Sequence, residues 1–308
     1  MPKNNALQEY FSVKFRRLLS GDPKGIPPWL EVIAEGDEGG LYLPTDAPWI
    51  VHRDFGTLVG GIRALLMQAL NPGALAGVSQ HSRYESDALG RLAGTIRWLT
   101  VTTFGSHAAL RKEAERVNKL HTRVQGEYVD AKNETRAYRA ADPNLLLWVH
   151  CAFMESFLVA HESYWITPIP KGDQPTGADN YVYQWGKSVE PLGLSNVPKS
   201  NKELNEVLDG FRDRGELRVN EDTLRVINFI KKPPLPFMAR IIYGLLFQAA
   251  VISLRPDFRK MLNIKTLPDW FIRSQTRFVL RMIRVAIGPE NQIQEGALNR
   301  LRRIGLIS

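Results

Sequence analysis

The segment that most constrains the fold begins at Asp142-Pro143 and runs to about Ala160. Proline is well suited to the first position of a helix, so Asp142-Pro143 is a strong helix start. The helix that follows is apolar on every side, and such a helix must be covered by other elements in all directions. We therefore expect this segment to be the central helix of a multi-helix domain.

Helical periodicity recurs along the rest of the chain, whereas the alternation of apolar and polar residues that marks strands is scarce. The predicted fold class is all-α, with one large domain over residues 46–290. A helix and a proline- and glycine-rich arm over residues 1–45 precede it, and a basic tail over residues 291–308 follows it. Gly126 is expected to cap the end of one helix. The expected helices lie at about 7–19, 55–70, 73–81, 87–103, 106–125, 142–160, 181–189, 200–212, 235–254 and 266–286.

The distribution of charge argues against a nucleic-acid-binding protein. The formal charge of +8 permits contact with acidic surfaces, but most basic residues alternate with acidic ones along helix faces. No run of basic residues with interleaved aromatics predicts a nucleic-acid groove. The clearest basic cluster is C-terminal, and we expect it to form a solvated surface or one that contacts a membrane peripherally. Its members are Arg273, Arg277, Arg281, Arg284, Arg300, Arg302 and Arg303.

Other features predict a soluble, cytoplasmic protein. The N-terminus leads into no apolar signal segment. The longest apolar run, Ile241 to Leu254, is too short to span a bilayer and is expected to form a buried helix. The single cysteine, Cys151, excludes an internal disulfide framework, and its apolar neighbours indicate a core position rather than a reactive thiolate.

The usual catalytic signatures are missing from the sequence. It contains no glycine-rich nucleotide loop, no G-x-S-x-G, no H-E-x-x-H and no C-x-x-C. A helical di-iron enzyme would need Glu-x-x-His pairs, and the chain has none. The six histidines are scattered, so a zinc site built from several of them would require distant parts of the chain to converge.

One histidine occupies a helix face that is otherwise apolar. Between residues 106 and 125 the positions around this face are mostly charged or polar. The core-facing positions are Leu110, Ala114, Val117, His121 and Val124. A buried imidazole must be hydrogen-bonded, titrating or bound to something. A single histidine that faces an apolar interior suits the proximal ligand of a heme, because porphyrin needs a large apolar slot and one axial imidazole.

The helix before it places Arg91 inside the protein. Arg91 and Thr95 share one helical face, while a second face carries Leu92, Ile96 and Leu99. An arginine in a helix buried on both faces needs an anionic partner. A heme propionate would serve, and so would a carboxylate in a structural network, for which Glu155 and Asp142 are the candidates.

The order of these motifs resembles a known family. The relevant segments are Gly60-Gly61-Ile62-Arg63-Ala64-Leu65-Leu66-Met67-Gln68, Asn71-Pro72, Gln80-His81-Ser82, Gly90-Arg91-Leu92-x-x-Thr95, Phe104-Gly105, Val117-x-x-Leu120-His121-x-x-Val124-x-Gly126 and Asp142-Pro143-x-Leu145-Leu146-Leu147-Trp148-Val149-His150. Each is weak alone, but their order and spacing are specific. Over roughly residues 45–260 the chain resembles the heme oxygenases that include bacterial rubber oxygenases (latex-clearing proteins) and fungal MpaB-type oxygenases.

The resemblance implies an all-α domain that encloses heme b. It makes His121 the proximal iron ligand and places Arg91 and Thr95 in the heme pocket, where they would act in binding and catalysis. Rubber oxygenases carry a lysine just before that threonine, able to take the distal iron position, whereas this chain has Gly94. This difference puts in doubt a resting state in which a lysine occupies the distal iron position. The family's known chemistry is dioxygen-dependent cleavage of isoprenoid double bonds, with the substrate of many members unassigned.

Two further histidines are candidates for the same site. His150 lies on a stripe of the central helix with Leu146, Phe153 and Phe157, and it is either a packed core histidine or part of the heme pocket. His81 is either a polar group near the distal side or an exposed helix end.

The function we predict is that of a heme b-dependent oxygenase that uses dioxygen on a small apolar, unsaturated substrate of isoprenoid or lipid-like kind. The alternatives are a heme enzyme that oxidises a polar metabolite or uses peroxide, a non-catalytic heme- or lipid-binding protein, and a purely structural helical protein.

Overall fold

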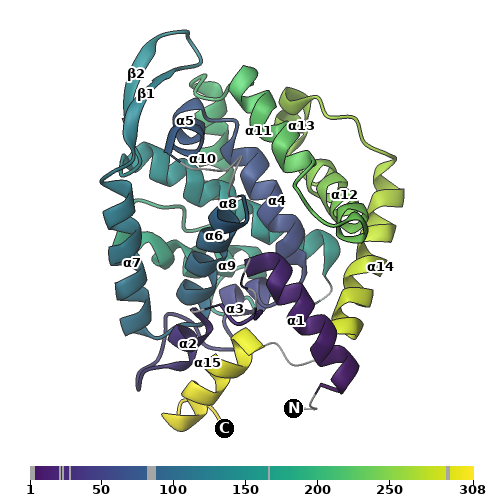
Figure 1. Cartoon of the computed structure of the whole chain (residues 1–308). Coiled ribbons are helices and arrows are strands. Elements are labelled where there is room, and N and C mark those ends of the chain that lie inside the picture. Colours follow the sequence, from purple (N-terminus) through teal and green to yellow (C-terminus); the bar gives the residue numbers. More distant parts are fainter. Residues whose placement is uncertain are drawn as a thin grey trace.

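The computed structural model describes residues 4–20, 22, 24–27, 29–81, 88–165, 167–288 and 292–308, and Figure 1 shows their arrangement. Helices dominate, so the predicted all-α class is confirmed, with one small antiparallel hairpin added. The elements are α1 (Ala6–Ser20), α2 (Trp29–Ala34), α3 (Ala47–His52), α4 (Gly56–Gln68), α5 (Pro72–His81), α6 (Ala88–Phe104), α7 (His107–His121), β1 (Gln125–Val129), β2 (Thr135–Arg139), α8 (Pro143–Tyr164), α9 (Gly177–Gly186), the 3-10 helix η1 (Lys187–Leu192), α10 (Asn201–Asp213), α11 (Glu221–Lys231), α12 (Phe237–Ile252), α13 (Pro256–Leu262), α14 (Asp269–Ile287) and α15 (Gln292–Arg303).

Helix α8 is the centre of the fold, as its composition predicts. The Asp142 carboxylate caps its start by accepting hydrogen bonds from the backbone N–H groups of Asn144 and Leu145. Its interior side chains, among them Trp148, Cys151 and Met154, are fully buried. Among the described helices of sufficient length, α8 alone is apolar enough to cross a membrane, and 61% of its most apolar window is buried within the protein.

Helix α4 packs against α8 unusually closely because its contact face carries glycines. A β-carbon added at Gly60 would lie 2.6 Å from Cδ1 and 3.2 Å from Cα of Phe157, so the two backbones approach to a distance that only glycine permits. Gly56 meets the backbone of Ala160 one turn further along the contact. Gly61, the next residue, points away from α8 into open space.

This geometry makes Gly60 and Gly61 a matched pair for measurement. Gly60→Ala is expected to lower the free energy of unfolding by about 1–3 kcal/mol, because the new methyl group overlaps Phe157. Gly61→Ala places the same methyl group in open space and is expected to raise stability by up to about 1 kcal/mol through helix propensity. Urea unfolding of both heme-free variants measures the difference. Equal effects at the two positions would contradict the close contact.

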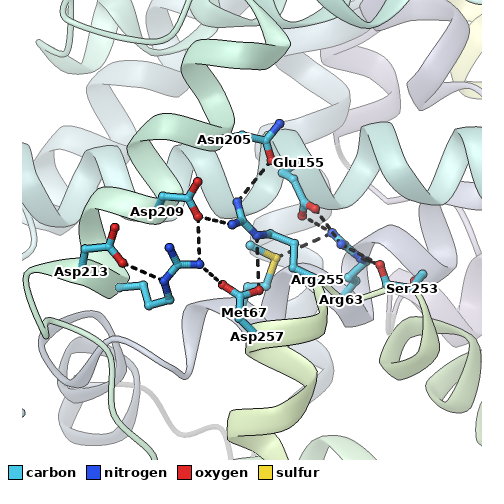
Figure 2. Close-up of polar contacts among 10 residues, drawn as sticks. Arg63, Met67, Glu155, Asn205, Asp209, Asp213, Ser253, Arg255 and Asp257 are labelled. Carbon is cyan, nitrogen blue, oxygen red and sulfur yellow. Dashed lines mark hydrogen bonds and ion pairs between the residues drawn. The ribbon is translucent and has the colours of Figure 1, made fainter.

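A buried ion pair joins three of the core helices. The Arg63 guanidinium of α4 makes a two-point contact with the Glu155 carboxylate of α8, and one of its two hydrogen bonds, from Nη2 to Oε1, is 2.7 Å long. Arg63 Nη2 also donates to the carbonyl oxygen of Ser253, which follows α12, at 2.8 Å. Figure 2 shows this contact beside a second charged cluster, in which Arg255 reaches Asp209 of α10. Both partners of the inner pair are almost fully buried.

Several elements differ from the sequence-based expectation. The proline-rich arm contains the short helix α2, and α3, α11, α13 and α15 are additional helices. Helix α7 ends at His121, so the prediction that Gly126 caps it is wrong. Gly126 lies in β1 opposite Tyr138 of β2, and a β-carbon there would lie 2.6 Å from Oε1 of Gln80. Its role is therefore to admit the Gln80 side chain.

Two helices in the C-terminal part of the chain, α12 and α15, also depart from the expectation. The residues expected to form a basic tail build α15, which packs against α2, with Ala297 and Leu301 fully buried. Arg300 is buried as well and donates to the carbonyl oxygens of Ile33 and Phe104, the latter at 2.9 Å. Helix α12, expected to be buried throughout, is buried only in its second half.

Candidate active site

The site begins with the antiparallel pair α6 and α7. Gly105 and Ser106 connect the two helices, and the Ser106 hydroxyl caps α7 by accepting a hydrogen bond from the Ala109 N–H. An ion pair between Arg97 and Glu113, 2.7 Å long, joins the two helices near their middles. His121 is the last residue of α7, at the end of that helix remote from the connection to α6.

The apolar stripe of α7 is buried at its start and opens towards its end. Leu110 and Ala114 are buried, whereas Val117 and His121 are half-buried. The Nδ1 atom of His121 is nevertheless buried and has no hydrogen-bond partner among the described residues. Burial, with a smaller contribution from Arg116, lowers the pKa of His121. Its imidazole is therefore neutral at pH 7, which is the form that binds a metal.

The structure places the backbone of Arg91 in the first turn of α6, but the Arg91 side chain lies outside the described residues, as does the segment 82–87 that follows His81. His81 itself is exposed at the end of α5, where Nε2 lies 2.9 Å from the Gln125 carbonyl oxygen. Thr95 is half-buried. Both carboxylates considered as partners of Arg91 are engaged elsewhere, Glu155 with Arg63 and Asp142 with the start of α8.

His150 lies in the second turn of α8. Its side chain is buried, and its Nε2 atom has no hydrogen-bond partner. Burial lowers the pKa of His150 to about 3, so it too is neutral. In the described part of the chain no hydrogen bond joins His121 to His150. The two histidines are therefore separate candidates for binding a ligand.

Three core helices carry apolar stripes that their neighbours do not fully cover. On α4 the half-buried residues are Leu58, Gly61 and Leu65, and on α8 they are Leu146, Val149 and Phe153. On α6 every residue from Gly94 to Leu99 is half-buried, and the apolar ones among them are Ile96, Trp98 and Leu99. A β-carbon at Gly94 or at Gly61 would meet nothing within 4 Å. Protein interiors are normally close-packed, so incompletely covered stripes on core helices leave room for another apolar group.

Sequence reasoning missed a histidine that links three helices. His52, the last residue of α3, contacts the Thr103 hydroxyl of α6 at 2.8 Å through Nδ1 and the Tyr181 hydroxyl of α9 at 2.9 Å through Nε2. Its ring packs edge-on against Trp185, with 4.4 Å between the centroids. Burial lowers the pKa of His52 to about 3. No local pattern marks this residue, because its partners lie on helices distant in the sequence.

A second buried group lies where α8 ends. His161 Nε2 contacts the Thr167 carbonyl oxygen at 2.8 Å, and its Nδ1 lies 3.8 Å from the carboxylate of the buried residue Asp54. Burial raises the pKa of Asp54 to about 6, against the opposing charges of Arg53 and Arg284. Burial also lowers the pKa of His161, so this contact joins a neutral imidazole to a carboxylate that is difficult to ionise.

These shifts predict that the heme-free protein is less stable in acid. The unfolded chain takes up protons on its histidines near pH 6.5, whereas His52 and His150 in the folded chain resist protonation down to about pH 3. Each therefore costs roughly 1.4 kcal/mol of stability per pH unit as the pH falls below 6.5. Asp54 acts in the opposite direction, since in the folded state it gains its proton near pH 6.

The net expectation is that the free energy of unfolding falls by roughly 2 kcal/mol between pH 7 and pH 5. Urea unfolding at the two pH values measures it. The variant His150→Gln should reduce the dependence on pH, and substitution of the exposed His107 by Gln is the control that should leave it unchanged. A dependence equal in all three proteins would contradict the burial of His150.

Comparison with known proteins identifies the family. A family model described as "ER-bound oxygenase mpaB/B'/Rubber oxygenase, catalytic domain" matches residues 49–287, which is most of the chain. The chain belongs to this family. Neither the comparison with curated proteins nor that with solved structures gave a match. The match confirms the resemblance seen in the motifs and supports an oxygenase catalytic domain.

Membership of this oxygenase family also bears on the kind of metal site to expect. Within the described residues no group of three or more histidine, cysteine, aspartate or glutamate side chains is placed to hold a metal ion. An iron atom held by porphyrin requires only one protein ligand, so a single imidazole such as that of His121 or His150 is sufficient.

Proposed function

We propose that this member of the mpaB/rubber oxygenase family is a heme b-dependent oxygenase acting with dioxygen on an apolar, unsaturated substrate of isoprenoid or lipid-like kind. The observation that carries the proposal is the state of His121. It is a neutral imidazole at the open end of an apolar stripe, and it has one buried nitrogen without a partner. The family match supplies the oxygenase class, and the incompletely covered stripes support an apolar cofactor and substrate.

The residues present fit a heme. In this proposal His121 holds the iron, Arg91 pairs with a propionate, and Thr95 supplies a hydroxyl at the pocket wall. The half-buried apolar residues of α4, α6 and α8 would form walls of the pocket and exclude water from it. When bound, the heme would supply the activation of dioxygen, and the protein would supply the axial ligand, the orientation of the substrate and a dry cavity.

The distal side is expected to be open. The position that carries a lysine in rubber oxygenases is Gly94, and the space beside it is empty for at least 4 Å among the described residues. Small ligands of iron, such as cyanide and imidazole, should therefore reach the heme without first displacing a protein side chain.

Expression with a heme precursor, followed by absorption spectroscopy and pyridine hemochromogen analysis, tests the cofactor. We expect a Soret band and about one heme b per chain, without covalent attachment. Oxygen consumption with squalene, set against its saturated counterpart squalane, then tests the reaction, and only squalene should support turnover. A protein that fails to bind added hemin would contradict the heme assignment. A heme-loaded protein without oxygen uptake on any apolar alkene would indicate a binding protein.

A further inference from the structure

Helix α14 presents an apolar stripe to solvent. Trp270 is 73% exposed, Phe278 61% and Val285 66%, and Met282 completes the stripe. These side chains recur along one side of the helix, while the opposite side, with Ile272, Thr276 and Leu280, is fully buried in the protein. Large apolar side chains grouped in this way mark an interaction surface rather than the scattered exposure usual in soluble proteins.

The helices packed against α14 also expose apolar side chains. Helix α14 packs between α1 and α12, and Figure 1 shows α12 and α14 along the right-hand edge of the molecule, with α1 crossing in front of the lower part. The first half of α12 exposes Phe237 (72%) and Ile241 (56%). The start of α1 is fastened to the end of α14 by a hydrogen bond from Asn4 to the Ile287 carbonyl oxygen, and it exposes Leu7. We call the exposed sides of α1, α12 and α14 the apolar face.

The charge beside this face is of one sign. Helix α14 contains four arginines and one carboxylate, Asp269, which is already paired with Arg259 of α13 at 2.8 Å. Arg277 and Arg281 are exposed along the edge of the apolar stripe, and on α12 Arg240 is exposed beside Ile241. Arg277 is held in place by a 3.0 Å hydrogen bond to the Ser163 carbonyl oxygen. A row of arginines beside a row of aromatic and aliphatic side chains is the arrangement of helices that lie in a membrane interface.

We propose that the apolar face docks the protein on an anionic phospholipid membrane. The apolar side chains of α14 and α12 would enter the acyl-chain boundary, and Arg277 and Arg281 would contact lipid phosphates. A second copy of the chain is the weaker candidate. A two-fold contact through this face would place the arginines of one α14 close to those of the other, and the one carboxylate of the helix, Asp269, is already paired with Arg259.

This surface includes only the α14 part of the C-terminal basic cluster that the sequence suggested for membrane contact. Arg300 of that cluster is buried and bound to backbone carbonyl groups, so it is unavailable to lipid. Arg302 and Arg303 are exposed on α15, whereas Arg277 and Arg281 are exposed on α14 beside its apolar stripe. None of the residues of this surface belongs to the proposed heme site, so the membrane proposal does not depend on the proposed oxygenase function.

Vesicle co-sedimentation tests the proposal with the full chain. We expect binding to vesicles that contain phosphatidylglycerol and much weaker binding to pure phosphatidylcholine. Arg277→Gln/Arg281→Gln should weaken binding to the anionic vesicles by about 30-fold, since each arginine near such a surface contributes about five-fold. Lys112→Gln/Lys202→Gln removes the same charge from exposed positions on α7 and α10 and should leave binding unchanged. An equal loss in both double variants would overturn the docking surface, because net charge alone would then explain the binding.

Two further measurements separate insertion from other outcomes. Lipids with brominated acyl chains should quench the fluorescence of Trp270, and the quenching should disappear in Trp270→Phe. Phe278→Ser should weaken binding, whereas Leu224→Ser, at an exposed leucine on α11, should not. Circular dichroism confirms that each variant is folded. The proposal would be overturned in favour of a contact between copies if the parent protein did not bind anionic vesicles but sedimented as a dimer, and if the Phe278→Ser variant sedimented as a monomer.

Discussion

Replacing His121 with alanine is expected to abolish the binding of heme b. Its neutral imidazole, with one buried nitrogen that lacks a partner, is the ligand that the proposed function requires. An apolar replacement removes the axial bond entirely, so the purified variant should lack the Soret band of the parent protein. Heme content per chain, measured after reconstitution with hemin, quantifies the loss. Added imidazole is expected to restore part of the binding, because it can occupy the space that the side chain leaves.

The matched control is His150→Gln. His150 also has a buried nitrogen without a partner, so it is the competing candidate for the iron ligand. Glutamine keeps the polarity and approximate size of the side chain, and a histidine that is only packed should tolerate it with a modest loss of stability. We expect the His150 variant to retain heme. Heme retained in His121→Ala and lost in His150→Ala would reverse the ligand assignment and move the site towards the α4–α8 contact.

The largest loss of stability outside the proposed cofactor site is expected for Glu155→Ala. This change leaves the Arg63 guanidinium buried, with the Ser253 carbonyl oxygen as its main remaining partner. Breaking one side of a buried ion pair typically costs about 3–5 kcal/mol, because the uncompensated charge stays out of water. Urea unfolding of the heme-free variant measures the cost. A variant that fails to fold at all can be compared with Glu155→Gln, which keeps a hydrogen-bond acceptor.

Two controls show whether the cost comes from the uncompensated charge. The double variant Arg63→Met/Glu155→Leu removes both charges and should be markedly more stable than Glu155→Ala, since apolar replacement of a buried pair is often nearly neutral. Glu206→Ala breaks the exposed pair with Lys202, where the closest atoms are 3.7 Å apart, and should cost under about 1 kcal/mol. A double variant as unstable as the single one would show that packing, rather than charge, dominates the site.

The parts of the fold that could be predicted are those in which local chemistry and burial agree. Helix α8 has a capping aspartate, a proline at its first position and apolar residues on every side, and the structure confirms its central place. The hairpin of β1 and β2 was missed because its strands are short and polar, with only Tyr138 buried in β2. Helix α15 was missed because a segment with Arg300, Arg302 and Arg303 has the composition of a solvated tail. The carbonyl oxygens that bind the buried Arg300 belong to residues far away in the sequence.

The candidate site was only partly visible in the sequence. His121 could be selected because a helical period relates it to Leu110 and Ala114, which the structure finds buried. Its role as iron ligand, and the roles of Arg91, Thr95 and His150, stay predictions. His52 could not be selected, because the hydroxyl groups that hold it come from Thr103 and Tyr181 and no sequence period relates these positions. Periodicity shows which side of a helix faces inward, but it does not show which helices meet.

The burial of Arg300 has a consequence for the order in which the chain folds during synthesis. The carbonyl oxygen of Ile33 receives its hydrogen bond from a residue 267 positions later. Helix α2 therefore emerges from the ribosome long before its partner α15 exists, and until then only earlier elements such as α6 can cover its inner side chains, Trp29 and Ile33. This part of the native structure can therefore be completed only after a late part of the chain has been made. A chain whose synthesis stops before α15 would leave this apolar patch exposed, where quality-control proteins can recognise it.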